Sequence, residues 1–212
     1  LDIVEGRASG RIIKGTKVQK LDELPLPNWD WFLDKPYNWK LELFGDSTKR
    51  VIPLNTSRGC PFMCQFCGVQ EVSGAAFRSI SAEKLFEIVV DLIQKYDIDG
   101  VYFREDNFTV NPGRVKKFCN LIIENNIKIN WACESRVGEL REKNIALMAK
   151  AGCIGLYVGV ESGSNRMLKM MQKGETAEDF LEKFPILANY GIKTYTTWEF
   201  GLPLENKEDR QL

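Results

Sequence analysis

The sequence contains no histidine among its 212 residues, and this absence excludes several kinds of site. Without imidazole there is no histidine-based acid–base catalysis and no activation of a serine nucleophile by a histidine. Zinc sites with nitrogen ligands are excluded for the same reason. Any metal bound by this chain must therefore be held by sulfur or oxygen atoms.

The chain also lacks an excess of charge of either sign. Lysine and arginine together number 29, as do aspartate and glutamate, so the formal net charge is zero. Because nucleic-acid-binding surfaces are rich in basic residues, we expect no nucleic-acid partner.

No apolar run is long enough to span a bilayer, and no stretch has the pattern of a signal peptide. We therefore expect no transmembrane segment and a cytoplasmic location. In that compartment the 6 cysteines are expected to be reduced rather than paired in disulfides.

The first fifty residues differ in pattern from the remainder. Prolines at 25 and 27 exclude a regular helix there. A short turn at 7–11 is expected between two extended segments. We interpret residues 1–50 as an irregular strap, a linker from an upstream domain, and the whole chain as a fragment of a longer protein. The aromatic residues of this strap are expected to pack on the following domain, with a cofactor-stacking surface as the alternative; they are Trp29, Trp31, Phe32, Tyr37 and Trp39.

Strand and helix patterns alternate from residue 51 to residue 212. Strands are expected at 51–56, 100–104, 129–133, 154–160 and 193–200. Helices are expected between them, at 81–96 with Ser81 as N-cap, at 112–124 with Pro112 in the first turn, at 139–150 with Gly152 closing it, and in segments up to about 190.

This alternation predicts parallel βαβ units, and hence an α/β domain that is either a barrel or an open doubly wound sheet. No GxGxxG turn follows the first strand, so a dinucleotide-binding fold has little support. We favour a partial (β/α)6 TIM-like barrel with five βα units visible in residues 51–212.

Three cysteines, Cys60, Cys64 and Cys67, crowd into a CxxxCxxC motif directly after the first expected strand. This is the end of a barrel at which active sites form. Ferredoxin-type clusters use four cysteines, and structural zinc is almost always four-coordinate, so three thiolates leave one metal position open. The other cysteines are expected in the core, with a fourth zinc ligand or a second cluster as alternatives; they are Cys119, Cys133 and Cys153.

This motif and the segments that follow it resemble the radical S-adenosylmethionine (SAM) superfamily. In order and spacing they are similar to the branch whose members often carry an N-terminal cobalamin-binding domain, over about residues 20 to 205. The segments are SerArgGlyCysProPheMetCysGlnPheCys (57–67), ArgGluAspAsnPheThrValAsn (104–111), TrpAlaCysGluSerArg (131–136), AlaGlyCys (151–153), GlyValGluSerGlySer (159–164) and GlyLeuPro (201–203).

The resemblance implies a radical SAM enzyme in which Cys60, Cys64 and Cys67 hold a [4Fe–4S] cluster. Such a cluster binds SAM at its open iron and cleaves it reductively to a 5′-deoxyadenosyl radical. Cobalamin, held by a domain outside this chain, would add radical methyl transfer. The implied partners are a small-molecule or natural-product-like substrate and an external electron donor of the flavodoxin or ferredoxin type.

The resemblance also implies contacts to the methionine part of SAM. Glu105 or Asp106 would receive the ammonium group, although the family usually has GlyGlyGlu where this chain has ArgGluAsp. Consecutive strand residues face opposite ways, so only one of the two can point inward, and we favour Asp106. Arg136 would clamp the carboxylate. The alternatives are a solvated loop carboxylate and a surface ion pair.

For the nucleoside part of SAM, the resemblance implies Glu161 or Ser162 at the ribose hydroxyls and close backbone approach at Gly163. Phe66 would pack near the adenine, with a core role as the alternative. A plain strand-to-helix turn capped by Ser164 is compatible with these roles. A different class of function, a non-catalytic zinc-stapled interaction module, also stays open.

Overall fold

The computed structural model describes residue 5 and residues 15–33 and 50–212. The turn expected at 7–11, together with Tyr37 and Trp39, lies outside these residues. In the described part of the chain, no helix combines the length and the apolar character needed to cross a membrane.

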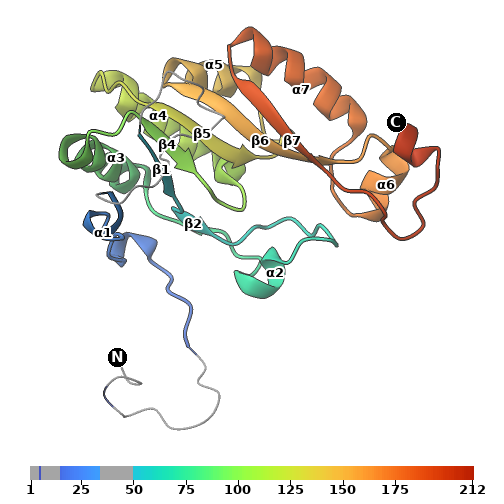
Figure 1. Cartoon of the computed structure of the whole chain (residues 1–212), viewed down its shortest axis with the longest axis horizontal. Helices are drawn as coiled ribbons and strands as arrows, with labels where there is room; N and C mark the ends of the chain where they lie inside the picture. The colour runs from blue at the N-terminus through green and yellow to red at the C-terminus, as the bar shows by residue number, and fades with distance from the viewer. Residues whose placement is uncertain (1–4, 6–14, 34–49) are drawn as a thin grey trace.

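Five parallel strands form the main sheet, and each lies beside the next one along the chain (Figure 1). This sequential order arises when all crossovers wind in the same direction, as in a barrel, and it differs from the reversed order of a doubly wound sheet. The α/β class is confirmed, and the sheet forms a partial TIM-like barrel. Its strands are β1 (Val51–Leu54), β4 (Gly100–Phe103), β5 (Asn130–Ser135), β6 (Cys153–Glu161) and β7 (Lys193–Trp198).

The crossover helices begin largely where the sequence predicts. The Ser81 side chain caps its helix by accepting a hydrogen bond from the Lys84 N–H at 3.1 Å, and Pro112 occupies the first turn of the next one. The exception is the third crossover helix, α5, which begins at Glu142 rather than at residue 139, so that Glu139 lies in the loop before it. These helices are α3 (Ala82–Tyr96), α4 (Pro112–Glu124), α5 (Glu142–Lys150), α6 (Asn165–Met170) and α7 (Ala177–Asn189).

The two faces of the sheet are packed differently. Val101 and Phe103 of β4 point to the face covered by α3, α4, α5 and α7, where the main hydrophobic core lies. Tyr102, between them, points to the opposite face because side chains alternate along a strand. There it packs against Tyr157, with ring centroids 5.4 Å apart, and Tyr157 packs against Tyr195 at 5.3 Å.

Short elements that the sequence did not reveal surround the cysteine motif. A two-stranded antiparallel ribbon flanks it, formed by β2 (Ser57–Arg58) and β3 (Arg78–Ser79), and α2 (Val69–Val72) follows it. Within residues 15–33 and 50–212, single turns of 3-10 helix are found at Leu21–Glu23, Phe108–Val110 and Asp209–Gln211.

The strap packs on the sheet domain only in part. Leu21 is buried in the core, and Trp29 packs against it before the short helix α1 (Asp30–Leu33). Trp31, by contrast, is 71% exposed. The expectation that the aromatic residues of the strap pack on the domain is therefore confirmed for Trp29 and wrong for Trp31.

Candidate active site

A cavity of about 190 Å³ lies at the carboxyl ends of the strands, between the cysteine loop and the sheet. Cys60, Cys64 and Cys67 form one wall. The rest is formed by residues of the cysteine loop and α2, by residues in or just after β4, β5, β6 and β7, and by one lysine from the loop between α6 and α7. Carboxyl ends of parallel strands are where barrel enzymes place their reactive groups.

The cysteine loop is shaped by its backbone contacts. Gly59 has a φ of 84°, and a Cβ there would lie 2.5 Å from the carbonyl oxygen of Ala76, so glycine is required at this position. The amide of Gln70 donates to the carbonyl oxygens of both Cys60 and Phe62 at 2.8 Å. These contacts hold the loop so that its three free cysteines are half-buried at the cavity.

The donor set fits a sulfur-ligated cluster. Burial raises the pKa of the Cys60 thiol, so a positively charged group is needed to hold its thiolate in this site. Among the described residues, no group of three or more cysteine, aspartate or glutamate side chains is close enough together to hold a single metal ion. Thiolates are the side chains that hold iron–sulfur clusters in proteins, and three thiols share one wall of this cavity.

The other three cysteines lie in the core, as expected. All three are buried, and none lines the cavity. Burial raises the pKa of Cys119 to about 12 and also raises the pKa of the other two. The structure therefore gives no support to a zinc site completed by one of these core cysteines, which are Cys119, Cys133 and Cys153.

The neighbouring carboxylates Glu105 and Asp106 lie in different places. Asp106 lines the cavity, and its Oδ2 accepts a hydrogen bond from the Gly59 N–H at 3.2 Å. The Glu105 side chain is 0% exposed and does not line the cavity. It accepts from the backbone N–H of Thr56 at 2.8 Å and pairs with Arg114 of α4 at 3.8 Å.

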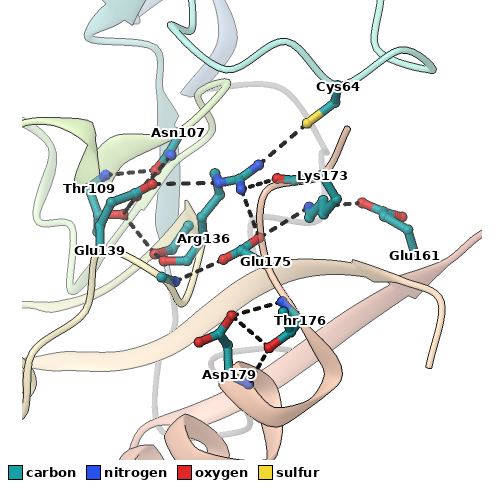
Figure 2. Close-up of polar contacts among 12 residues, drawn as sticks. Cys64, Asn107, Thr109, Arg136, Glu139, Glu161, Lys173, Glu175, Thr176 and Asp179 are labelled. Carbon is teal, nitrogen blue, oxygen red and sulfur yellow. Dashed lines mark hydrogen bonds and ion pairs between the residues drawn. The ribbon is translucent and has the colours of Figure 1, made fainter. Parts of the chain in front are cut away.

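Arg136 follows β5 and reaches the cavity wall, and both of its Nη groups donate to the protein (Figure 2). Its Nη1–H donates to the Sγ of Cys64 at 3.4 Å. Its Nη2 lies 3.3 Å from Glu175, and its Nε lies 3.5 Å from Glu139. The guanidinium also stacks over the Phe62 ring, 4.0 Å from the centroid.

Lys173 and Glu175, on the loop before α7, extend this charged cluster. The Lys173 side chain is 5% exposed and its Nζ lies 3.5 Å from Glu161 and 3.6 Å from Glu175 (Figure 2). Sequence reasoning missed both loop residues. The only local signal is Gly174 between them, whose φ of 69° marks a turn without indicating that the turn reaches a cavity.

Glu161, at the end of β6, lines the cavity. Its φ of 68° is unusual for a residue other than glycine, and it falls where the pairing of β6 with β7 shifts register. Backbone conformations of this kind cluster at functional sites. Burial raises the pKa of this carboxyl, and the charge of Lys173 opposes that shift.

Phe66 lines the cavity and also packs against the core, so both roles considered for it are compatible with its place. Ser162 and Gly163 do not line it. The Ser162 hydroxyl accepts from the Ser164 N–H at 3.1 Å, and Ser164 caps α6 as expected. Glu134 of β5, which sequence reasoning passed over, lines the cavity instead, and burial raises its pKa.

Comparison with known proteins agrees with this geometry. A model of the radical SAM superfamily matches residues 54–212. An uncharacterised methyltransferase of Pyrococcus horikoshii is 31% identical over 192 residues, which are 91% of this chain and 40% of that protein. An anaerobic magnesium-protoporphyrin IX monomethyl ester cyclase of Rubrivivax gelatinosus is 25% identical over 201 residues, 94% of this chain and 36% of that protein. This chain thus spans well under half of either relative.

A solved structure supports the fold. The radical S-adenosylmethionine methyltransferase TsrM from Kitasatospora setae, with cobalamin and a [4Fe–4S] cluster bound, superposes with a TM-score of 0.69. The match is 20% identical and covers 76% of this chain and 30% of that chain.

Proposed function

The chain belongs to the radical SAM superfamily, whose enzymes use a [4Fe–4S] cluster and SAM, and we propose that Cys60, Cys64 and Cys67 are its cluster ligands. The observation that carries this proposal is the division of the six cysteines. These three are half-buried on one cavity wall at the carboxyl ends of the strands, and the others are buried in the core. When bound, the cluster delivers one electron to the sulfonium of SAM, which is chemistry that no side chain supplies.

The residues of the cavity suit the charges of SAM. Asp106 is exposed at the wall and can accept a charge-assisted hydrogen bond from the ammonium group. Arg136 and Lys173 place positive charge on the same wall for the carboxylate. Glu161 is positioned to accept from ribose hydroxyls, and Phe66 offers an apolar surface to the adenine. All five would position SAM and exclude water.

The finer part of the proposal is the reaction. The relative from Pyrococcus is named a methyltransferase, and TsrM is a methyltransferase with cobalamin bound. We infer radical methyl transfer to a small-molecule substrate, with cobalamin held outside this chain and one electron supplied by a flavodoxin- or ferredoxin-type donor. Methyl transfer is favoured over cyclisation because two of the three compared proteins are named methyltransferases and one is named a cyclase.

Single cysteine substitutions test the ligand assignment. Cys60→Ala, Cys64→Ala and Cys67→Ala should each prevent cluster assembly after anaerobic reconstitution of the chain, because each removes one of the three proposed ligands and none of the other three cysteines lines the cavity. The measurements are iron and sulfide content, absorption near about 400 nm, and formation of 5′-deoxyadenosine from SAM with dithionite as reductant.

Cys119→Ala is the matched control, since it removes a buried thiol far from the cavity. Its iron content should equal that of the unchanged protein. Full iron loading in any of the three loop variants would show that the ligands are wrongly assigned. A colourless protein with one bound zinc would contradict the enzyme proposal itself.

A further inference from the structure

We propose that Arg136 sets the reduction potential of the cluster through its contact with Cys64, and that Glu139 and Glu175 hold it in place for this role. The inference rests on the proposed cluster ligands. It begins with one contact, the Nη1–H of Arg136 aimed at the Cys64 Sγ at 3.4 Å (Figure 2). This distance is in the normal range for a donor with sulfur as acceptor, and the arginine side chain is only 8% exposed.

The rest of the guanidinium is fixed by groups that are themselves fixed. Glu175 pairs with its Nη2 at 3.3 Å and also accepts from the Gly138 N–H at 2.8 Å. Glu139 lies 3.5 Å from its Nε and accepts from the Asn107 amide at 3.1 Å. The side chain therefore cannot swing away from the sulfur without breaking two ion pairs, and the one with Glu175 is buried on both sides.

These contacts also limit what else Arg136 can do. A bidentate clamp on a carboxylate needs two parallel N–H donors. Nη2 already donates to the backbone oxygen of Lys173, and Nε faces Glu139. Nη1 donates to the Sγ of Cys64. Arg136 is thus better placed to act on a ligand sulfur than to bind SAM at both oxygens.

A positive charge and an N–H at a ligand sulfur favour the reduced cluster. Reduction adds one electron from an external donor to the cluster and breaks no bond, so the reduced form carries one more negative charge. Hydrogen bonds to sulfur, nearby charge and solvent exposure are the factors that set cluster potentials. In a buried site such charges interact more strongly than in water. Glu139 and Glu175 offset part of the effect, so the balance among the three determines the potential.

The test is a redox titration of the reconstituted chain without SAM, followed by the electron paramagnetic resonance signal of the reduced cluster. Arg136→Gln should move the midpoint potential to more negative values. Glu175→Gln, which removes a buried negative charge at nearly constant shape, should move it in the opposite direction. A tenfold change in the equilibrium constant for one-electron reduction corresponds to 59 mV, and we expect a shift of at least that size for Arg136→Gln.

Two further variants distinguish the effect of the Arg136–Cys64 contact from the effect of positive charge alone. Arg136→Lys keeps the charge without the fixed fork and should fall between Arg136→Gln and the unchanged protein. Arg166→Gln removes a positive charge from α6, where that arginine pairs with Asp209, and should leave the potential unchanged. If Arg136→Gln fails to take up iron, the test uses the other two variants. Glu175→Gln should raise the midpoint potential, and Arg136→Lys should lower it.

The possible results distinguish failure of the role inferred for Arg136 from failure of the proposed cluster ligands. Full iron loading with unchanged potentials in the Arg136 and Glu175 variants would overturn this inference and leave the cysteine ligands intact. An Arg166→Gln shift as large as that of Arg136→Gln would also overturn it, because the effect would then be one of overall charge. Failure of the unchanged chain to assemble any cluster would instead overturn the proposed function.

Discussion

At the scale of single residues, Glu105 and Asp106 are neighbours with different surroundings. The sequence predicts that only one of them points into the barrel mouth, because strand side chains alternate. It cannot predict what the other one does. The structure places Glu105 at the base of the cysteine loop, where it joins Thr56 and Arg114, and leaves Asp106 on the cavity wall.

Asp106→Asn should therefore weaken SAM binding without loss of the cluster. The change removes one charged hydrogen-bond acceptor, worth about 1.5–3 kcal/mol, which corresponds to roughly tenfold or more in affinity. Equilibrium binding of SAM to the reconstituted chain, with iron content measured alongside, checks this. An affinity change below about threefold would show that Asp106 does not contact SAM.

Glu105→Gln is the matched variant, with the same chemical change one residue earlier. It should lower the free energy of unfolding by about 3–5 kcal/mol, because it leaves a buried arginine without its charged partner. Chemical denaturation of the cluster-free protein measures this loss. Stability equal to that of Asp106→Asn would contradict the buried role of Glu105.

The residues that the sequence missed share one property. Lys173 and Gln70 line the cavity from segments whose path depends on tertiary packing, so neither spacing nor periodicity marks them as cavity residues. The three cysteines of the loop could be predicted as ligands because the CxxxCxxC spacing is short and can be read directly from the sequence. The same motif places Glu161 on the cavity wall and Ser162 and Gly163 outside the lining, and the positive φ of Glu161, which the motif does not reveal, lies at this division.

At the scale of elements, two glycines end two helices in the same way. Gly152 follows α5 and Gly191 follows α7, each two residues after the last helical position. Their φ values are 91° and 73°, the left-handed region that favours glycine. Their surroundings differ, because a Cβ at 152 would overlap the carbonyl oxygen of Ile129, whereas a Cβ at 191 meets nothing within 4 Å.

Gly191→Ala should cost about 1–2 kcal/mol of unfolding free energy, the conformational penalty of a side chain in the left-handed region. Gly152→Ala carries the same penalty plus the displacement of the backbone carbonyl of Ile129, the residue before β5, so it should cost clearly more. Urea denaturation of the two variants compares them directly. Equal losses would mean that the contact with Ile129 relaxes freely.

Element boundaries show where the sequence is informative. Strands and long helices could be predicted because their periodic burial extends over many residues. The pair β2 and β3 could not, since each has two residues and no periodicity. The helix expected from 139 begins at Glu142, and this later start leaves Glu139 free to pair with Arg136.

At the scale of the whole molecule, the sequential strand order places β7 at one edge of the sheet. An edge strand presents unpaired backbone groups to which another strand can bind. Apolar side chains gather beside this edge in a groove lined by Val160, Phe180, Leu181, Phe184 and Trp198. Trp198 itself is 47% exposed. Backbone and side chains at this edge therefore both favour association.

The 212-residue chain, produced alone, is accordingly expected to self-associate through β7 at micromolar concentrations while still assembling its cluster. Trp198→Lys should restore a monomer, because a charged side chain on an edge strand opposes pairing. Leu26→Lys, at a position that is 45% exposed on the strap, is the control and should leave the association unchanged. Anaerobic size-exclusion chromatography with light scattering gives the mass over a range of concentrations. A monomer at every concentration would show that this edge is protected within the chain as it stands, and a monomer restored equally by Leu26→Lys would place the contact away from β7.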